Sequence, residues 1–188
     1  MDPITALIDK TEEIIGHSPH PAIVTVPIGA WTVSNVADAL AFVTGNERFD
    51  DVARVSMAVG LVGAVGAAAT GLRDYGRIPQ HRPSHKIATT HGLGNALVSS
   101  LFVASYIMRT RDQQAGRPTR PLARILGLAG GGLVLYTAWL GGKLVEEYGE
   151  GVKPVMDRMS HDESDHSQGR ERLHPETPLG LPREFMKG

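Results

Sequence analysis

The chain has 188 residues, enough for one domain and a tail, and its formal net charge at neutral pH is −1. Nucleic-acid-binding proteins normally carry a strong basic excess, so this balance of charge excludes that class. The absence of cysteine excludes disulfides, thiolate metal sites, iron–sulfur ligation by this chain and a cysteine nucleophile.

The N-terminal segment, within residues 1–16, is predicted to form a short amphipathic helix over 3–16. Apolar residues recur there at helical spacing, and Asp9, Glu12 and Glu13 fall between them. Two placements fit this pattern: a helix in the membrane interface, which the net negative charge of the segment disfavours, or a helix packed on the bundle. The segment lacks the positive start of a cleavable signal peptide, so we expect the first span to be retained as an anchor.

Four apolar segments dominate the rest of the chain, although its mean hydropathy of −0.11 resembles that of a soluble protein. Three of them contain uncharged runs of about 18 residues or more, the length that crosses a bilayer. Glycine is frequent in these runs, as in membrane helices, whereas an interior glycine costs a soluble helix about 1 kcal/mol relative to alanine. We therefore predict an all-α integral membrane protein, an antiparallel four-helix bundle. The predicted spans are 22–45, 52–75, 86–109 and 122–145.

The composition changes at about Pro154 to charged residues, Ser, His and Pro. Such a segment cannot bury enough apolar surface to offset chain entropy, so we predict a membrane domain at 17–155 and a disordered tail at 156–188. Four crossings place both termini on the same side of the membrane. Lys and Arg are balanced between the two sides, and the arginines around 110–123 slightly favour a cytoplasmic position for that loop.

Antiparallel spans bring residues that are distant in sequence to a common layer at one membrane face. That layer is predicted to hold His20 before span one, Asp74 at the end of span two, His91 at the start of span three and Tyr148 after span four. Asp38 lies deep in span one, nearer the opposite face.

His91 is the most informative single residue in this layer. It lies roughly 8 Å beyond Lys86 by the helical rise, and Asn95 follows at i+4 on the same helix face. Ionisable groups within spans are costly and face the bundle interior, so His91 and Asp38 are candidate functional residues. The alternative is a hydrogen-bonded polar network around His91 and a protonated, packed Asp38.

Pro27 interrupts the first span. Because it lacks a backbone N–H and clashes with the preceding turn, we predict a kink there that leaves the carbonyl oxygen of Ile23 without its helical partner.

Several short blocks in residues 17–155 resemble a family of uncharacterised bacterial membrane proteins, a numbered domain of unknown function with four predicted spans. The blocks, in order, are His20-Pro21, Thr25-Val26-Pro27-Ile28-Gly29, Gly71-Leu72-Arg73-Asp74-Tyr75, His91 with Asn95, Leu140-Gly141-Gly142-Lys143-Leu144-Val145, Tyr148-Gly149 and Gly151-Val152. Some members of that family are fused to a Rieske-type iron–sulfur domain, so the resemblance implies electron transfer near a membrane. This chain has no cysteine, and an iron–sulfur partner must therefore be another polypeptide.

Two redox functions are compatible with these residues. In the first, the chain anchors a redox partner or handles a quinone for it, with hydrogen bonds to the quinone from His91, Asp74 and Tyr148 and a Rieske-type or other redox protein as the partner. In the second, one b-type haem lies between spans one and three with His20 and His91 as its axial metal ligands.

A structural or transport role without redox chemistry is a third alternative, and a second copy of the chain is a further candidate partner beside the lipid bilayer. The sequence contains no hydrolase triad, phosphate loop or zinc-protease motif. We therefore expect no catalytic activity from this chain alone.

Overall fold

The structure is a computed structural model that describes residues 3–152. Within this range every regular element is an α-helix, which confirms the predicted all-α class. The predicted disordered tail, 156–188, lies outside the described residues. The helices are α1 (Pro3–Ile15), α2 (His20–Ile23), α3 (Thr25–Thr44), α4 (Arg48–Tyr75), α5 (Pro83–Gln114) and α6 (Pro121–Glu146).

Within residues 3–152, four helical segments are long and apolar enough to cross a membrane, the number predicted from the sequence. The first span is formed by α2 and α3 together, and α4, α5 and α6 form the others. The helices extend beyond the apolar runs, most clearly in α5, which continues past the predicted end at residue 109 to Gln114. Charged residues mark the limit of the hydrocarbon layer, not the end of the helix.

The helix ends follow local sequence signals. Pro83 and Pro121 each occupy the first turn of a helix, where the missing backbone N–H would have had no helical partner. Helix α3 ends before Gly45, which has a left-handed φ of 66° that glycine adopts at little cost.

The first span is interrupted at Val24, between α2 and α3, as expected from Pro27. Proline at position 27 cannot donate to the carbonyl oxygen of Ile23, four residues earlier, so the helical hydrogen-bond pattern fails there. The backbone N–H of Ile28 donates to the carbonyl oxygen of Val24 over 3.3 Å, so regular helix resumes immediately after the break.

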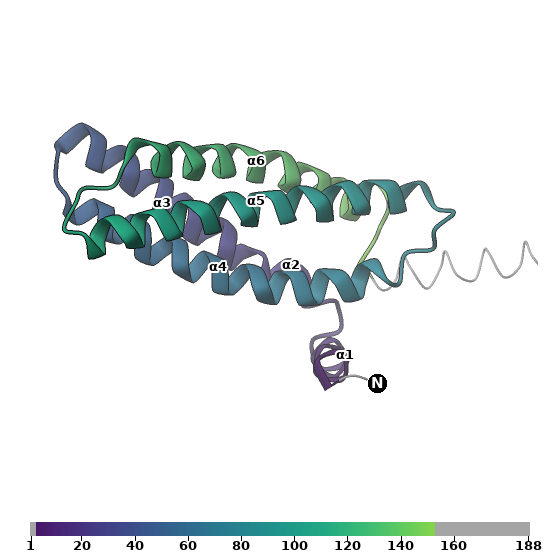
Figure 1. Ribbon diagram of the computed structural model, residues 1–188. Helices are drawn as coiled ribbons and strands as arrows, with labels where there is room; N and C mark the ends of the chain where they lie inside the picture. Colours follow the sequence, from purple (N-terminus) through teal and green to yellow (C-terminus); the bar gives the residue numbers. More distant parts are fainter. Residues whose placement is uncertain (1–2, 153–188) are drawn as a thin grey trace, which may run out of the picture. The chain divides into compact units, whose positions relative to one another are not determined.

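The four spans form two antiparallel hairpins, α3 with α4 and α5 with α6 (Figure 1). A core of Trp31, Met57, Val98, Phe102 and Val134 joins them. The rings of Trp31 and Phe102 stack at a centroid distance of 4.2 Å, which links α3 to α5. Large apolar side chains also cover the outer surface, including Phe42 and Leu135, as expected where lipid replaces water.

Candidate functional site

His91 is held in one orientation by two neighbours. Its Nδ1 lies 2.8 Å from the backbone carbonyl oxygen of Thr137 on α6, and the Nδ2 of Asn95 lies 3.1 Å from its Nε2. A carbonyl oxygen can only accept, so Nδ1 carries the proton and donates it. Nε2 is then unprotonated and accepts a hydrogen bond from the Asn95 amide.

His20 has the same tautomer. Its Nδ1 lies 3.1 Å from Thr70 Oγ1, and the Thr70 hydroxyl donates its single proton to the backbone carbonyl oxygens of Gly66 and Ala67, which lie 2.9 and 3.2 Å away. Thr70 Oγ1 is therefore left to accept from His20 Nδ1–H, and the Nε2 of His20 is unprotonated. Each imidazole thus presents one basic nitrogen.

The two histidines come from different helices, His20 from α2 and His91 from α5. Each ring packs against a glycine of a neighbouring helix, since a Cβ added at Gly71 would lie 2.8 Å from His20 Cε1 and one at Gly141 would lie 3.1 Å from His91 Cε1. Each imidazole ring can therefore lie this close to the neighbouring helix only because Gly71 and Gly141 have no side chain. We call His20, Thr70, Asp74, His91 and Asn95 the histidine layer.

Asp74 joins this layer through Ser18 and Arg73. Its carboxylate accepts a short hydrogen bond from the Ser18 hydroxyl and another, 3.1 Å long, from Arg73 Nη1. Ser18 Oγ in turn accepts from the backbone N–H of His20 over 3.2 Å. The predicted grouping of His20, Asp74 and His91 at one end of the bundle is confirmed.

Tyr148 lies in the turn after α6, at the same end of the bundle. Within residues 3–152 it makes none of the hydrogen bonds that connect the histidine layer. Nearby, the buried Glu150 accepts a 2.8 Å hydrogen bond from the Ser84 hydroxyl, which connects the chain after α6 to the start of α5.

Helix α1 is attached to this end by ion pairs. Arg73 on α4 pairs with Asp9 and Glu12, and Arg77 donates to Glu12 over 2.8 Å. Burial acts to raise the pKa of Glu12, but the hydrogen bonds and positive charges of Arg73 and Arg77 outweigh it and lower this pKa below its ordinary value of 4.5.

Because the pKa of Glu12 is lower in the folded state, the ionised Glu12 carboxylate stabilises the docked position of α1 at pH values above the ordinary pKa of 4.5. This stabilisation is lost as the pH falls through the lowered pKa and the carboxylate is protonated. A fluorophore on Ala6→Cys should therefore lose anisotropy as the pH is lowered below about 4.5. The same label on a Glu12→Gln background should start with lower anisotropy and change less. Identical titrations in the two proteins would show that Glu12 does not hold α1.

Asp38, at the other end of the bundle, is not an isolated packed carboxyl group, because it lies directly against the guanidinium of Arg109. Its two oxygens accept hydrogen bonds of 2.8 and 2.5 Å from Arg109 Nη1 and Nη2, and both side chains are almost fully buried. Arg109 Nε also lies 3.1 Å from Ser105 Oγ. The arrangement is a bidentate pair in which Nη1, Nη2 and Nε of the guanidinium each contact an oxygen atom.

A second pair, Arg124 Nη2 to Asp50 at 2.8 Å, lies beside the first. The two pairs connect α3 to α5 and α4 to α6, and thus tie one hairpin to the other. We call Asp38, Asp50, Arg109 and Arg124 the arginine layer.

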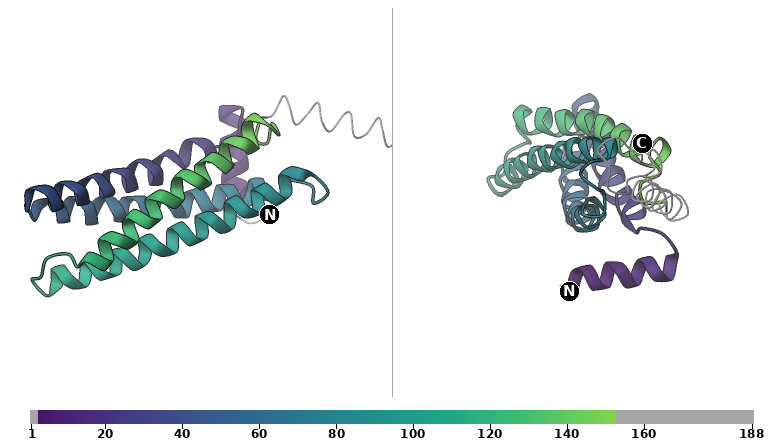
Figure 2. Two further views of the ribbon diagram at one scale, coloured as in Figure 1. Left: turned by 90° about the horizontal axis from the view of Figure 1, so that it is seen from above. Right: turned by 90° about the vertical axis from the view of Figure 1, so that its right-hand side faces the viewer.

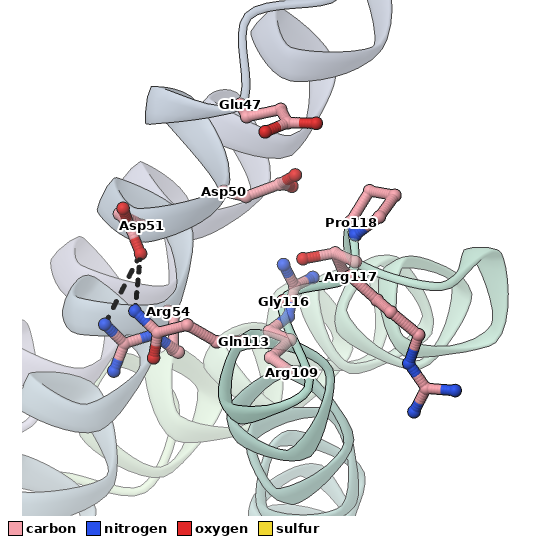
Figure 3. Close-up of a pocket in the computed structure, with 10 residues that line it drawn as sticks. Glu47, Asp50, Asp51, Arg54, Arg109, Gln113, Gly116, Arg117 and Pro118 are labelled. Atoms are coloured by element: carbon pink, nitrogen blue, oxygen red, sulfur yellow. Dashed lines mark hydrogen bonds and ion pairs between the residues drawn. The ribbon is translucent and has the colours of Figure 1, made fainter.

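The arginine layer adjoins a pocket of about 250 Å³. Figure 3 shows its lining side chains, with Asp51 bonded to both Arg54 and Gln113. Three carboxylates and three guanidinium groups line this pocket, so its charge favours neither an anion nor a cation. The acidic groups are Glu47, Asp50 and Asp51, and the basic groups are Arg54, Arg109 and Arg117.

Sequence reasoning missed the groups that position the predicted residues: Ser18, Thr70, Thr137 and Arg109. The hydroxyl groups of Ser18 and Thr70 and the backbone carbonyl of Thr137 could not be recognised from the sequence, because whether they contact a histidine depends on how each helix is rotated about its axis. Arg109 could have been found, since a carboxylate as deep as Asp38 needs a positive charge at matching depth and Arg109 follows the uncharged run of span three.

Comparison with known proteins identifies the family. The family described as a predicted membrane protein, DUF2231, matches residues 16–154, which include all four spans and both polar layers. Searches of curated proteins and of solved structures give no match. The chain is a multi-pass membrane protein that belongs to the DUF2231 family.

Proposed function

We propose that the chain is a membrane subunit that binds a quinol in the histidine layer and serves a redox partner as its anchor. The observation that carries this proposal is the orientation of His91, whose Nδ1–H is fixed on Thr137 while Nε2 offers a lone pair. A quinol hydroxyl that replaced the Asn95 amide at Nε2 would donate its proton to a base already held in place.

Oxidation of a quinol releases two protons and two electrons. We assign one proton to His91 Nε2 and the other to the unprotonated Nε2 of His20, and Asp74 would stabilise the resulting positive charge on His20. The electrons pass one at a time to an acceptor held by the partner, a Rieske-type or other redox protein, because this chain has no cysteine to hold an iron–sulfur cluster. Tyr148 is a candidate for a hydrogen bond to the second oxygen of the quinol.

Photolabelling tests this proposal. An azido-quinone, reduced to the quinol and added to the protein in lipid nanodiscs, should label peptides that contain His20 or His91, and unlabelled quinol should compete. Loss of one buried hydrogen bond costs about 1 kcal/mol, so His91→Ala should weaken binding by about fivefold to tenfold. His17→Ala, at an exposed histidine of the same end, is the matched control and should bind normally. Equal labelling of the two variants would refute the assignment.

A b-type haem is the second candidate, and one feature favours it. Histidines that bind a metal through one ring nitrogen usually donate the other N–H to a carbonyl or similar acceptor, as His91 and His20 both do here. His20 and His91 would hold the iron through Nε2, and the haem would supply one-electron transfer. A reduced-minus-oxidised spectrum with a b-type α-band that His91→Ala abolishes would favour haem. Protein purified after expression with ample haem and without that band would exclude it.

A further inference from the structure

Helix α1 has two distinct faces. At 100° per residue its aliphatic residues fall within an arc of roughly 120°, and its carboxylates lie outside this arc. The aliphatic residues, here called the aliphatic edge, are Ile4, Leu7, Ile8, Ile14 and Ile15; the carboxylates are Asp9, Glu12 and Glu13.

Ion pairs on the acidic face of α1 fix how the helix is rotated about its own axis and where it lies along the length of α4. Asp9 and Glu12 pair with Arg73, whose side chain is only 7% exposed, so this side of the helix is bound to the end of α4. Arg73 is the first charged residue after the uncharged part of α4. Helix α1 therefore lies where the hydrocarbon layer gives way to lipid headgroups.

The aliphatic edge remains largely uncovered. Ile8 is buried, but Ile4, Leu7 and Ile14 are 60%, 67% and 76% exposed. Figure 2 shows α1 outside the bundle and lying across the direction of the spans. With 13 residues it is too short to cross a bilayer.

We propose that α1 is an interfacial helix whose aliphatic edge is inserted between the lipids of the leaflet next to the histidine layer. The carboxylates of α1 exceed its single lysine by two charges, which by itself would repel anionic headgroups. Arg73 and Arg77 supply two positive charges directly against this face and oppose that repulsion. The proposal does not depend on quinol or haem binding.

Site-specific fluorescence tests it, because the chain has no cysteine and single cysteines can be labelled without a background. Leu7→Cys and Ile14→Cys report on the aliphatic edge. Ala6→Cys and Glu13→Cys, which are also exposed but lie outside that edge, are the matched controls. Each variant is labelled with an environment-sensitive dye and reconstituted in phosphatidylcholine–phosphatidylglycerol vesicles.

Labels at positions 7 and 14 should emit at shorter wavelength, be quenched by lipids with a nitroxide near the top of the acyl chain, and resist aqueous iodide. Labels at positions 6 and 13 should emit at longer wavelength, be quenched little by the nitroxide lipids and be quenched readily by aqueous iodide. If iodide reaches all four positions equally, α1 does not insert. If positions 7 and 14 are shielded from both quenchers and the blue shift grows with the protein-to-lipid ratio, a second copy of the chain covers the edge and the proposal is wrong.

Discussion

Replacing Arg109 by alanine is expected to lower the free energy of unfolding of the bundle by about 3–5 kcal/mol, the usual cost of removing one partner from a buried ion pair. The substitution leaves the Asp38 carboxylate buried without its bidentate donor, and Ser105 loses the Nε contact. Equilibrium unfolding in mixed micelles of dodecyl sulfate and a mild detergent, followed by circular dichroism, measures the loss.

Arg111→Ala is the matched control, since Arg111 lies two residues further along α5 and is exposed. It should change stability by less than about 0.5 kcal/mol, as is usual for surface substitutions. The double variant Asp38→Leu with Arg109→Leu removes both charges, so it should lose less stability than Arg109→Ala. Equal losses for Arg109→Ala and Arg111→Ala would mean that the pair contributes nothing to stability.

Gly60→Ala should destabilise the bundle by about 1–3 kcal/mol, the usual range for overpacking a core. A Cβ at this position would overlap the five-membered ring of Trp31. That ring cannot move aside freely, because it is stacked on Phe102 at an interplanar angle of 11°. The added methyl group must therefore separate α3 from α4 or break the stack.

Gly132→Ala provides the comparison, since a Cβ there meets nothing within 4 Å. It should be neutral or slightly stabilising, because alanine is the better helix former. Near-ultraviolet circular dichroism of the Trp31–Phe102 stack should change in Gly60→Ala and stay constant in Gly132→Ala. A Gly60→Ala protein as stable as the Gly132→Ala protein would show that the core can relax around the extra methyl group.

The spans could be predicted from sequence because exclusion of charge from a stretch of bilayer length is a strong constraint. Their ends could not, since helices such as α5 continue into the polar region where charge no longer signals a boundary. Antiparallel topology was sufficient to place His20, Asp74 and His91 in one layer. It could not indicate Thr137 or Thr70 as their partners, because those contacts depend on helix rotation and on the absence of side chains at Gly141 and Gly71.

The ion pairs between the hairpins also have a consequence for biogenesis. The hairpin of α3 and α4 is synthesised first, and Asp38 must enter the membrane before Arg109 exists to neutralise it. An acidic or basic residue at the centre of an inserting helix costs about 2.5–3.5 kcal/mol, and less nearer its end. The hairpin of α3 and α4 is therefore less stable in the membrane by itself than after the hairpin of α5 and α6 has packed against it. Arrival of α5 and α6 removes that penalty, which makes completion of the bundle the favourable step of assembly and leaves a truncated chain exposed to membrane quality control.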